Sequence, residues 1–279
     1  MKKIYFLSFF VSFLLYSEEI PDFRMRRVEA GQYYKMRIGT VKEPEKRMVF
    51  YKVVISKPYK LSATEVTVGQ WKAVMGGESP YQFSKGDDYP VTNVSYNDIQ
   101  EFLKKLNRNS SGKPYRLPTY AEWELAAKGP ANSEKEQKIF YWGNNPALGN
   151  DYEWNTDNSG NESHKVGTRK PNPNGIYDLW GNAGEWLSDG RINASTRELR
   201  LGNKGDGICL LENDPDYCYP ADHTVTDPAG DAGADRFCII EFCEASILKE
   251  VGTTNEFYKA FRREYKTGRL GFRLAQDAD

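Results

Sequence analysis

Residues 175–187 place two carboxylates in a stretch dense in glycine and tryptophan. Asp178 and Glu185 can converge if the chain coils between them. Gly181 then lets the backbone turn so that its own carbonyl and that of Ala183 point the same way. Calcium binds hard oxygen donors of these two kinds, so the segment predicts a calcium loop. The alternative is a tight turn with two solvated acids, since the denser acid ladder of an EF-hand loop is absent.

Thiols are the second candidate chemistry, and all of them fall in the last third of the chain. An even number of cysteines in an exported protein favours disulfides, and four cysteines permit three pairings that sequence cannot rank. Zinc is the competing interpretation, but there is no paired C-x-x-C spacing and the only histidines are His164 and His223. Disulfides or free thiols are therefore expected at Cys209, Cys218, Cys238 and Cys243.

The first residues predict export. Lys2 and Lys3 form a basic region, residues 4–16 form an apolar stretch, and Ser17 offers a small residue for cleavage, which together is the layout of a secretory signal peptide over residues 1–17. The apolar stretch is too short to cross a bilayer as a helix, so no transmembrane span is predicted. The mature chain is expected to begin near Glu18 and to be periplasmic, cell-surface or secreted.

Composition limits the possible partners. The chain has 279 residues and a net charge of −1, which provides no overall electrostatic footprint for nucleic acid or an anionic membrane. Aromatic residues make up 14% of the chain, so the core is expected to rest on Trp, Tyr and Phe. Neither a repeat nor a low-complexity linker divides the sequence. A single domain over residues 18–279 is therefore predicted.

The elements that position these groups are short. Strands are predicted within residues 25–40 and over 48–55, which are rich in aromatic and β-branched residues. From Gly129 onward, Gly, Asn, Pro and Asp are dense, which indicates long loops with occasional strands. Loops of this length in a compact domain usually serve function or are held by metal or disulfides.

Three helices are predicted between these strands and loops. Thr67 precedes the first, and Ser95 and Thr119 begin sequences that match a capping box. Trp71 and Trp123 occur at helical spacing with other apolar residues, which assigns them to the core rather than to a ligand.

Five segments together resemble the formylglycine-generating enzyme family, also called the sulfatase-modifying-factor domain. They occur in the family's order from about Val28 to the C-terminus. The segments are Thr64-Glu65-Val66-Thr67-Val68, Pro90-Val91-Thr92-Asn93-Val94-Ser95, residues 116–127 (RLPTYAEWELAA), Gly181-Asn182-Ala183-Gly184-Glu185-Trp186 and Gly271-Phe272-Arg273-Leu274. The resemblance implies an α+β, C-type-lectin-like fold with little regular secondary structure and long loops.

The resemblance also implies a structural calcium ion. Asp178, the carbonyls of Gly181 and Ala183, and Glu185 match the positions at which the family binds it. A second family calcium site is expected in the preceding loop, near Asn150.

The chain departs from the family where catalysis takes place. The family's enzymes oxidise a substrate cysteine to formylglycine with oxygen and a copper ion held by a cysteine pair, which follows an Arg-Val-x-Arg-Gly-Gly-Ser segment. Here Asp235-Arg236-Phe237 matches the approach to that segment, but no glycines follow. Counted from Arg236, the cysteine positions fall on Ala245 and Glu250, which cannot bind copper(I).

A second register keeps the enzyme alternative open. If Gly233 aligns with the glycine segment, Cys238 and Cys243 fall on the catalytic pair and reproduce its spacing. In that register the protein is a copper-dependent formylglycine-generating oxidase. The first register is preferred, because the second misaligns Arg236 and leaves an extra stretch before Gly271. The preferred register predicts no catalysis.

Residues 237–269 are the part least like the family. Large apolar, aromatic and charged side chains on an exposed surface form binding hot spots, although the same residues could belong to the core. The predicted ligand-binding residues are Phe237, Ile239, Glu241, Phe242, Phe257, Tyr258, Phe261, Arg262, Arg263 and Tyr265.

A conserved frame with an aberrant last segment before Gly271-Phe272-Arg273 is similar to the variable proteins that retroelements diversify on this same fold. The sequence therefore predicts an exported, calcium-stabilised, non-catalytic protein that displays residues 237–269 to an unknown protein or surface ligand. The alternatives are the copper oxidase and a purely structural envelope protein.

Overall fold

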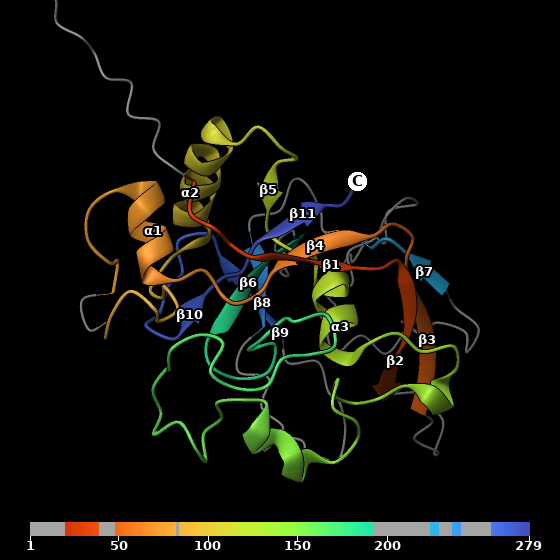
Figure 1. The fold of residues 1–279 in the computed structure, drawn as a ribbon. Coiled ribbons are helices and arrows are strands. Elements are labelled where there is room, and N and C mark those ends of the chain that lie inside the picture. Colours follow the sequence, from red (N-terminus) through yellow and green to blue (C-terminus); the bar gives the residue numbers. More distant parts are fainter. Residues whose placement is uncertain (1–19, 39–47, 82–83, 192–223, 229–235, 241–257) are drawn as a thin grey trace, which may run out of the picture.

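The computed structural model describes residues 20–38, 48–81, 84–191, 224–228, 236–240 and 258–279. Its first sheet joins the two ends of the chain. The strands run in the order β1 (Met25–Val28), β4 (Tyr59–Ser62), β11 (Ala275–Asp277) and β5 (Tyr115–Arg116). Strand β11 pairs antiparallel with both β4 and β5, so the segment that follows Arg273 lies across the centre of the molecule (Figure 1).

The second sheet contains the described strands of the predicted ligand segment 237–269. Its order is β10 (Leu270–Gly271), β6 (Gly184–Arg191), β8 (Arg236–Ile240) and β9 (Tyr258–Arg262). Strand β6 follows the glycine-rich loop directly. It pairs parallel with β10 and antiparallel with β8. The predicted calcium loop and the predicted ligand segment thus meet on one sheet.

The third sheet is the long hairpin of β2 (Gly31–Ile38) and β3 (Met48–Ile55) with β7 (Thr224–Thr226) alongside β3. The predicted strands at 25–40 and 48–55 are therefore confirmed. The hairpin stands away from α1 and α2, at the opposite side of the molecule in Figure 1.

Three capped helices begin where the sequence predicts. They are α1 (Val68–Met75), α2 (Tyr96–Asn109) and α3 (Tyr120–Lys128), with N-caps at Thr67, Ser95 and Thr119. All three caps form a full capping box, including that of Thr67, where Gln70 supplies the returning side chain. Two 3-10 helices, η1 (Glu134–Glu136) and η2 (Pro146–Asp151), interrupt the long loop after α3.

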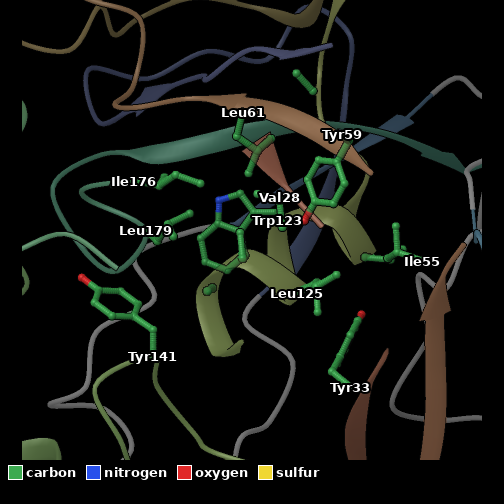
Figure 2. Close-up of a cluster of buried hydrophobic side chains, with 14 of the residues drawn as sticks. Val28, Tyr33, Ile55, Tyr59, Leu61, Trp123, Leu125, Tyr141, Ile176 and Leu179 are labelled. Carbon is green, nitrogen blue, oxygen red and sulfur yellow. The ribbon is translucent and has the colours of Figure 1, made fainter. Parts of the chain in front are cut away.

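Aromatic side chains build two core clusters. The first surrounds Trp123 of α3, with Tyr59, Leu61 and Ile176 around it, as Figure 2 shows. The second joins α1 and α2 to the end of the chain; Trp71 stacks on Phe102 at 5.3 Å between ring centroids, and Phe272 meets Phe102 edge-on. Trp71 and Trp123 are both buried, which confirms their assignment to the core.

In the described ranges, small sheets, short helices and long loops occur together, which confirms the α+β class. Among the residues that the structure describes, no helix is long and apolar enough to cross a membrane. Residues 1–17, predicted to be a signal peptide, lie outside them.

Candidate functional site

The glycine-rich loop is held in a conformation that most residues avoid. Asp178, Gly181 and Asn182 all have positive φ, at 53°, 78° and 58°. The backbone N–H of Asn182 donates to the carbonyl of Trp154 at 2.9 Å, and a Cβ on Gly181 would lie only 2.1 Å from that same oxygen. Only glycine fits this approach, because it lacks the Cβ that would collide.

Both acids of the loop are buried, so the interpretation of a turn with two solvated acids is wrong. Asp178 is 1% exposed and Glu185 is 2% exposed. An ionised carboxylate in the interior needs a counter-charge or a proton. The loop therefore holds a charged centre inside the molecule.

Arg273 supplies the counter-charge to Glu185. Its Nε lies 2.9 and 2.7 Å from the two carboxylate oxygens of Glu185, and its Nη2 lies 2.6 Å from Oε1. Nη2 also donates to the carbonyls of Tyr177 and Asp178, and the indole of Trp123 donates to Glu185 Oε2 at 3.0 Å. Burial opposes the charge of Arg273, but Glu185, together with Glu65 and Asp178, outweighs burial and raises the guanidinium pKa.

Glu65 completes this buried charged centre, which comprises Glu65, Asp178, Glu185 and Arg273. Glu65 Oε1 accepts from Asn182 Nδ2 at 3.0 Å, and Asp178 Oδ2 accepts from the backbone N–H of Gly167 at 2.6 Å. Within the described part of the chain, their other oxygens, Glu65 Oε2 and Asp178 Oδ1, are buried without a hydrogen-bond partner.

Glu65 and Asp178 influence each other's protonation. Burial raises the pKa of Asp178 to about 6, and burial together with the neighbouring Asp178 raises the pKa of Glu65 well above its usual range. Three acids around one guanidinium leave an excess of negative charge. A proton on Glu65 or Asp178, or a cation beside them, would reduce that excess.

The donors fit the predicted calcium ion only in part. Asp178 keeps one oxygen for an ion, whereas both oxygens of Glu185 are committed to Arg273 and Trp123. No cluster of three or more His, Cys, Asp or Glu side chains that could hold a metal occurs in the ranges described. Near the second predicted site, the Asn150 side chain accepts from Asn158 at 3.0 Å.

Trp154, whose carbonyl accepts from Asn182, packs beside the glycine-rich loop. The ring of His164 stacks on it at 3.7 Å, and the guanidinium carbon of Arg169 lies over it at 3.7 Å. His164 Nε2 is within hydrogen-bonding distance of the Ser159 carbonyl at 2.9 Å. The histidine therefore serves the loop rather than a metal.

Another buried acid, Asp189, lies further along β6. It is 1% exposed and accepts from the backbone N–H of Tyr120 at 2.5 Å. Burial raises the pKa of Asp189 to about 7. Close by, Lys35 lies over the Tyr120 ring at 4.0 Å and 3.6 Å from Glu124, so the start of α3 is tied to both β2 and β6.

Some of the predicted ligand-binding residues lie in β8 and β9. Phe237 pairs with Phe261 in the ladder, Ile239 lies opposite Lys259, and Tyr258 lies opposite Ile240. Glu241, Phe242 and Phe257 lie outside the described residues, as do three of the cysteines, Cys209, Cys218 and Cys243. The remaining cysteine, Cys238, is in β8 opposite Ala260.

The described ligand residues divide between core and surface. Phe261 and Tyr265 stack at 4.0 Å between ring centroids and are partly buried against the second core cluster, so packing occupies part of each side chain. Arg262 is exposed, and the guanidinium carbon of Arg263 lies 5.9 Å from the centre of the Tyr96 ring.

The backbone after β9 is hydrogen-bonded to the rest of the domain, here called the frame, at the start of α2 and at the start of β6. The N–H of Asn97 donates to the carbonyl of Arg263 at 3.4 Å, that of Asn93 to Thr267 at 2.9 Å, and that of Gly184 to Arg269 at 2.9 Å. Since β8 pairs with β6, both ends of the segment 241–257 leave strands that the frame holds.

Sequence reasoning overlooked two members of the charged centre, Glu65 and Arg273, although both stood inside matched motifs. The available signal was a charged residue within an apolar run, as in Gly271-Phe272-Arg273-Leu274-Ala275. A charge in such a run is buried and must have a partner.

A family model described as "Sulfatase-modifying factor enzyme 1-like domain" matches residues 18–278. The "Chaperone protein LppX" of Paenibacillus barcinonensis is 30% identical over 216 residues, which cover 61% of this chain and 76% of that protein. The "Formylglycine-generating enzyme" of Bos taurus is 34% identical over 129 residues, which cover 42% of this chain and 32% of that protein.

Among solved structures, "Treponema denticola variable protein 1" has the same fold. Its TM-score is 0.60 at 23% identity, over 91% of this chain and 95% of that one.

Proposed function

Because the chain belongs to the sulfatase-modifying factor enzyme 1-like domain family, we propose that it is an exported, non-catalytic member that displays its C-terminal segment 237–269 to a ligand. The proposal rests on one observation above all. The chain enters segment 241–257 from β8 and leaves it through β9, and both strands are held to the frame by β6 and by the turn after β9. A rigid base reduces the ordering cost of binding.

The charged centre supports display rather than chemistry. It lies inside the molecule and ties β6, the C-terminal segment and the glycine-rich loop together through Arg273. A buried pair with this many bonds specifies one arrangement of the elements it joins, and it exposes no group to a substrate. Its role is to hold the frame from which the segment is displayed.

One relative supports a polypeptide ligand, because it is named a chaperone and chaperones act on polypeptides. The relative named "Formylglycine-generating enzyme" supports the oxidase alternative instead. Diversification of the segment by a retroelement remains a hypothesis, which a near-copy of the segment beside the gene would support.

Calcium remains part of the proposal. Its ligands would be Asp178 and the carbonyls of Gly181 and Ala183, with Glu185 added only if it leaves Arg273. The ion would neutralise the excess negative charge of the centre and stiffen the loop. Asp178 Oδ1, a buried oxygen without a partner among the described residues, is the feature that supports it.

The copper oxidase is the second candidate, and Cys238 in β8 is the observation that keeps it open. Mass spectrometry of the unreduced mature protein after thiol alkylation, followed by copper(I) titration, separates the two. Cysteines that are disulfide-bonded, or that do not bind copper(I), would support the display function. Free Cys238 and Cys243 that bind one copper ion tightly would overturn it.

Binding itself can be tested without knowing the ligand. A random-peptide phage library is selected on the mature protein, and the selected peptides are measured against a variant in which residues 241–257 are replaced by a Gly-Ser linker of equal length. A second variant, with the same replacement over residues 201–217, is the matched control. Loss of binding only in the first variant is expected; equal binding to all three proteins would refute display by this segment.

A further inference from the structure

Strand β9 ends the second sheet on the side away from β6. The strand order is β10, β6, β8 and β9, and in the part of the chain that the structure describes no strand pairs with the outer side of β9. An edge of this kind carries backbone N–H and C=O groups that an added strand can pair with.

Strand β9 and the turn after it are basic. Residues 259–266 contain four basic residues and one acid, Glu264, whereas the whole chain has a net charge of −1. Arg262 ends β9 and Lys266 lies in the turn; both are exposed, and neither forms an ion pair with any described residue.

The turn after β9 packs against the first turn of α2. The N–H of Asn97 in that turn donates to the carbonyl of Arg263. Asp98 of the same turn belongs to the helix cap, because its Oδ2 accepts from the backbone N–H and the hydroxyl of Ser95. The attraction for an acidic ligand at this edge therefore comes from Arg262 and Lys266.

Charged edges protect a strand from pairing with copies of itself, because like charges would face each other. The same charges select an acidic partner. An acidic strand can form both backbone hydrogen bonds with β9 and ion pairs with the basic side chains. We propose that the β9 edge binds an extended acidic polypeptide segment, which adds as a strand beside Tyr258–Arg262 with its carboxylates beside Arg262 and Lys266.

This inference rests on the proposed function and names the chemistry of its ligand. The edge proposal differs from the proposed function in the site of recognition, because it assigns recognition to the edge of the sheet rather than to segment 241–257. Segment 241–257 would add specificity to an interaction that the edge provides.

The test uses fluorescence anisotropy with three labelled peptides of nine residues. One alternates Glu and Thr, one alternates Lys and Thr, and one is the acidic peptide with alternate backbone amides N-methylated. N-methylation removes the donors that a strand needs while keeping the charge. Each is measured against the mature protein at low and at physiological salt.

Two charge-reversed proteins complete the design. Arg262→Glu with Lys266→Glu changes the edge, and Lys135→Glu with Lys138→Glu makes the same change at two exposed positions beside η1. We expect the acidic peptide to bind the native protein and the second variant equally, and the first variant about tenfold more weakly. N-methylation should weaken binding by at least the same factor, and the Lys peptide should not bind.

Several outcomes would overturn the proposal. Equal binding of the N-methylated peptide would show attraction without strand addition, and equal loss in both variants would show a non-specific charge effect. No measurable binding of the acidic peptide at low salt, or tighter binding of a single-stranded oligonucleotide that displaces it, would also overturn it.

The two proposals fail separately. If phage-selected peptides bind through segment 241–257 while the acidic peptide does not bind, only the edge proposal falls. If the acidic peptide binds the edge but replacement of 241–257 changes nothing, the edge stands and display by that segment falls.

Discussion

Replacing Arg273 with Met tests whether the charged centre holds the frame together. Methionine has a comparable length and keeps the apolar contacts, but it leaves Glu65, Asp178 and Glu185 buried without a cation. Removing one partner of a buried ion pair costs about 3–5 kcal/mol, because the other charge stays uncompensated. For a domain of this size, that corresponds to a melting temperature lower by roughly 6–20 °C.

The pH dependence identifies the cause of the loss. In the native protein burial raises the pKa of Asp178 to about 6, and it raises that of Glu65 well above its usual range. Without the guanidinium these acids would hold their protons to still higher pH. The native state then binds more protons than the unfolded chain, so stability falls as pH rises. The loss caused by Arg273→Met should therefore be smaller at pH 5 than at pH 7.5.

Urea unfolding followed by tryptophan fluorescence measures both quantities. The matched control is Arg27→Met, which removes an arginine that pairs with Glu29 at the surface, at 43% and 72% side-chain exposure. An exposed pair contributes at most about 1 kcal/mol, so this variant should unfold nearly as the native protein does. A loss below about 1 kcal/mol for Arg273→Met, or the same loss at both pH values, would refute the reasoning.

Three further predictions concern β6 and the loop before it. Asp189→Asn keeps an acceptor for the backbone of α3 but removes a carboxyl whose native pKa is about 7. Because of that raised pKa, the native protein should lose up to about 4 kcal/mol of stability between pH 4 and 7, and the variant should not show this loss. The same slope of unfolding free energy against pH in both proteins would contradict this. Gly181→Ala should lower the unfolding free energy by more than about 3 kcal/mol, because φ is +78° and the added Cβ meets the Trp154 carbonyl. The control is Gly160→Ala, where φ is +63° but the added Cβ meets no atom within 4 Å. It should lower the unfolding free energy by only about 1–2 kcal/mol in the same assay. Asp178→Ala should lower the melting temperature in calcium but not in chelator if an ion saturates the loop, since a ligand at 100 times its Kd adds about 2.7 kcal/mol; equal losses in both buffers would count against a bound ion.

Local patterns in the sequence were sufficient for the helices and for the family. A capping box or an amphipathic repeat needs only neighbours three or four residues away, so Ser95, Thr119 and the core tryptophans Trp71 and Trp123 were identified correctly. The glycine-rich loop was also recognised, because its glycines and aromatics leave few alternatives. The motifs placed the chain in its family over nearly its whole length.

The partners of the charged groups came only from the tertiary structure. Glu65, Asp178 and Arg273 are far apart in the chain, and nothing in their local sequence says that the last would neutralise Glu185. That pairing arises because β4, β6 and the C-terminal segment meet in the core, a long-range contact that no local periodicity encodes.

The surface of the ligand segment was decided in the same way. Its composition alone could not separate Phe261, which is partly buried against the core, from the neighbouring Arg262, which faces solvent. Adjacent residues of a strand point to opposite faces, and only the pairing of β9 with β8 at the edge of the sheet determines which face is buried and which side remains open. Residue types along the chain thus determined the family and the local elements, whereas burial and strand pairing between distant segments decided which of those residues are available to a ligand.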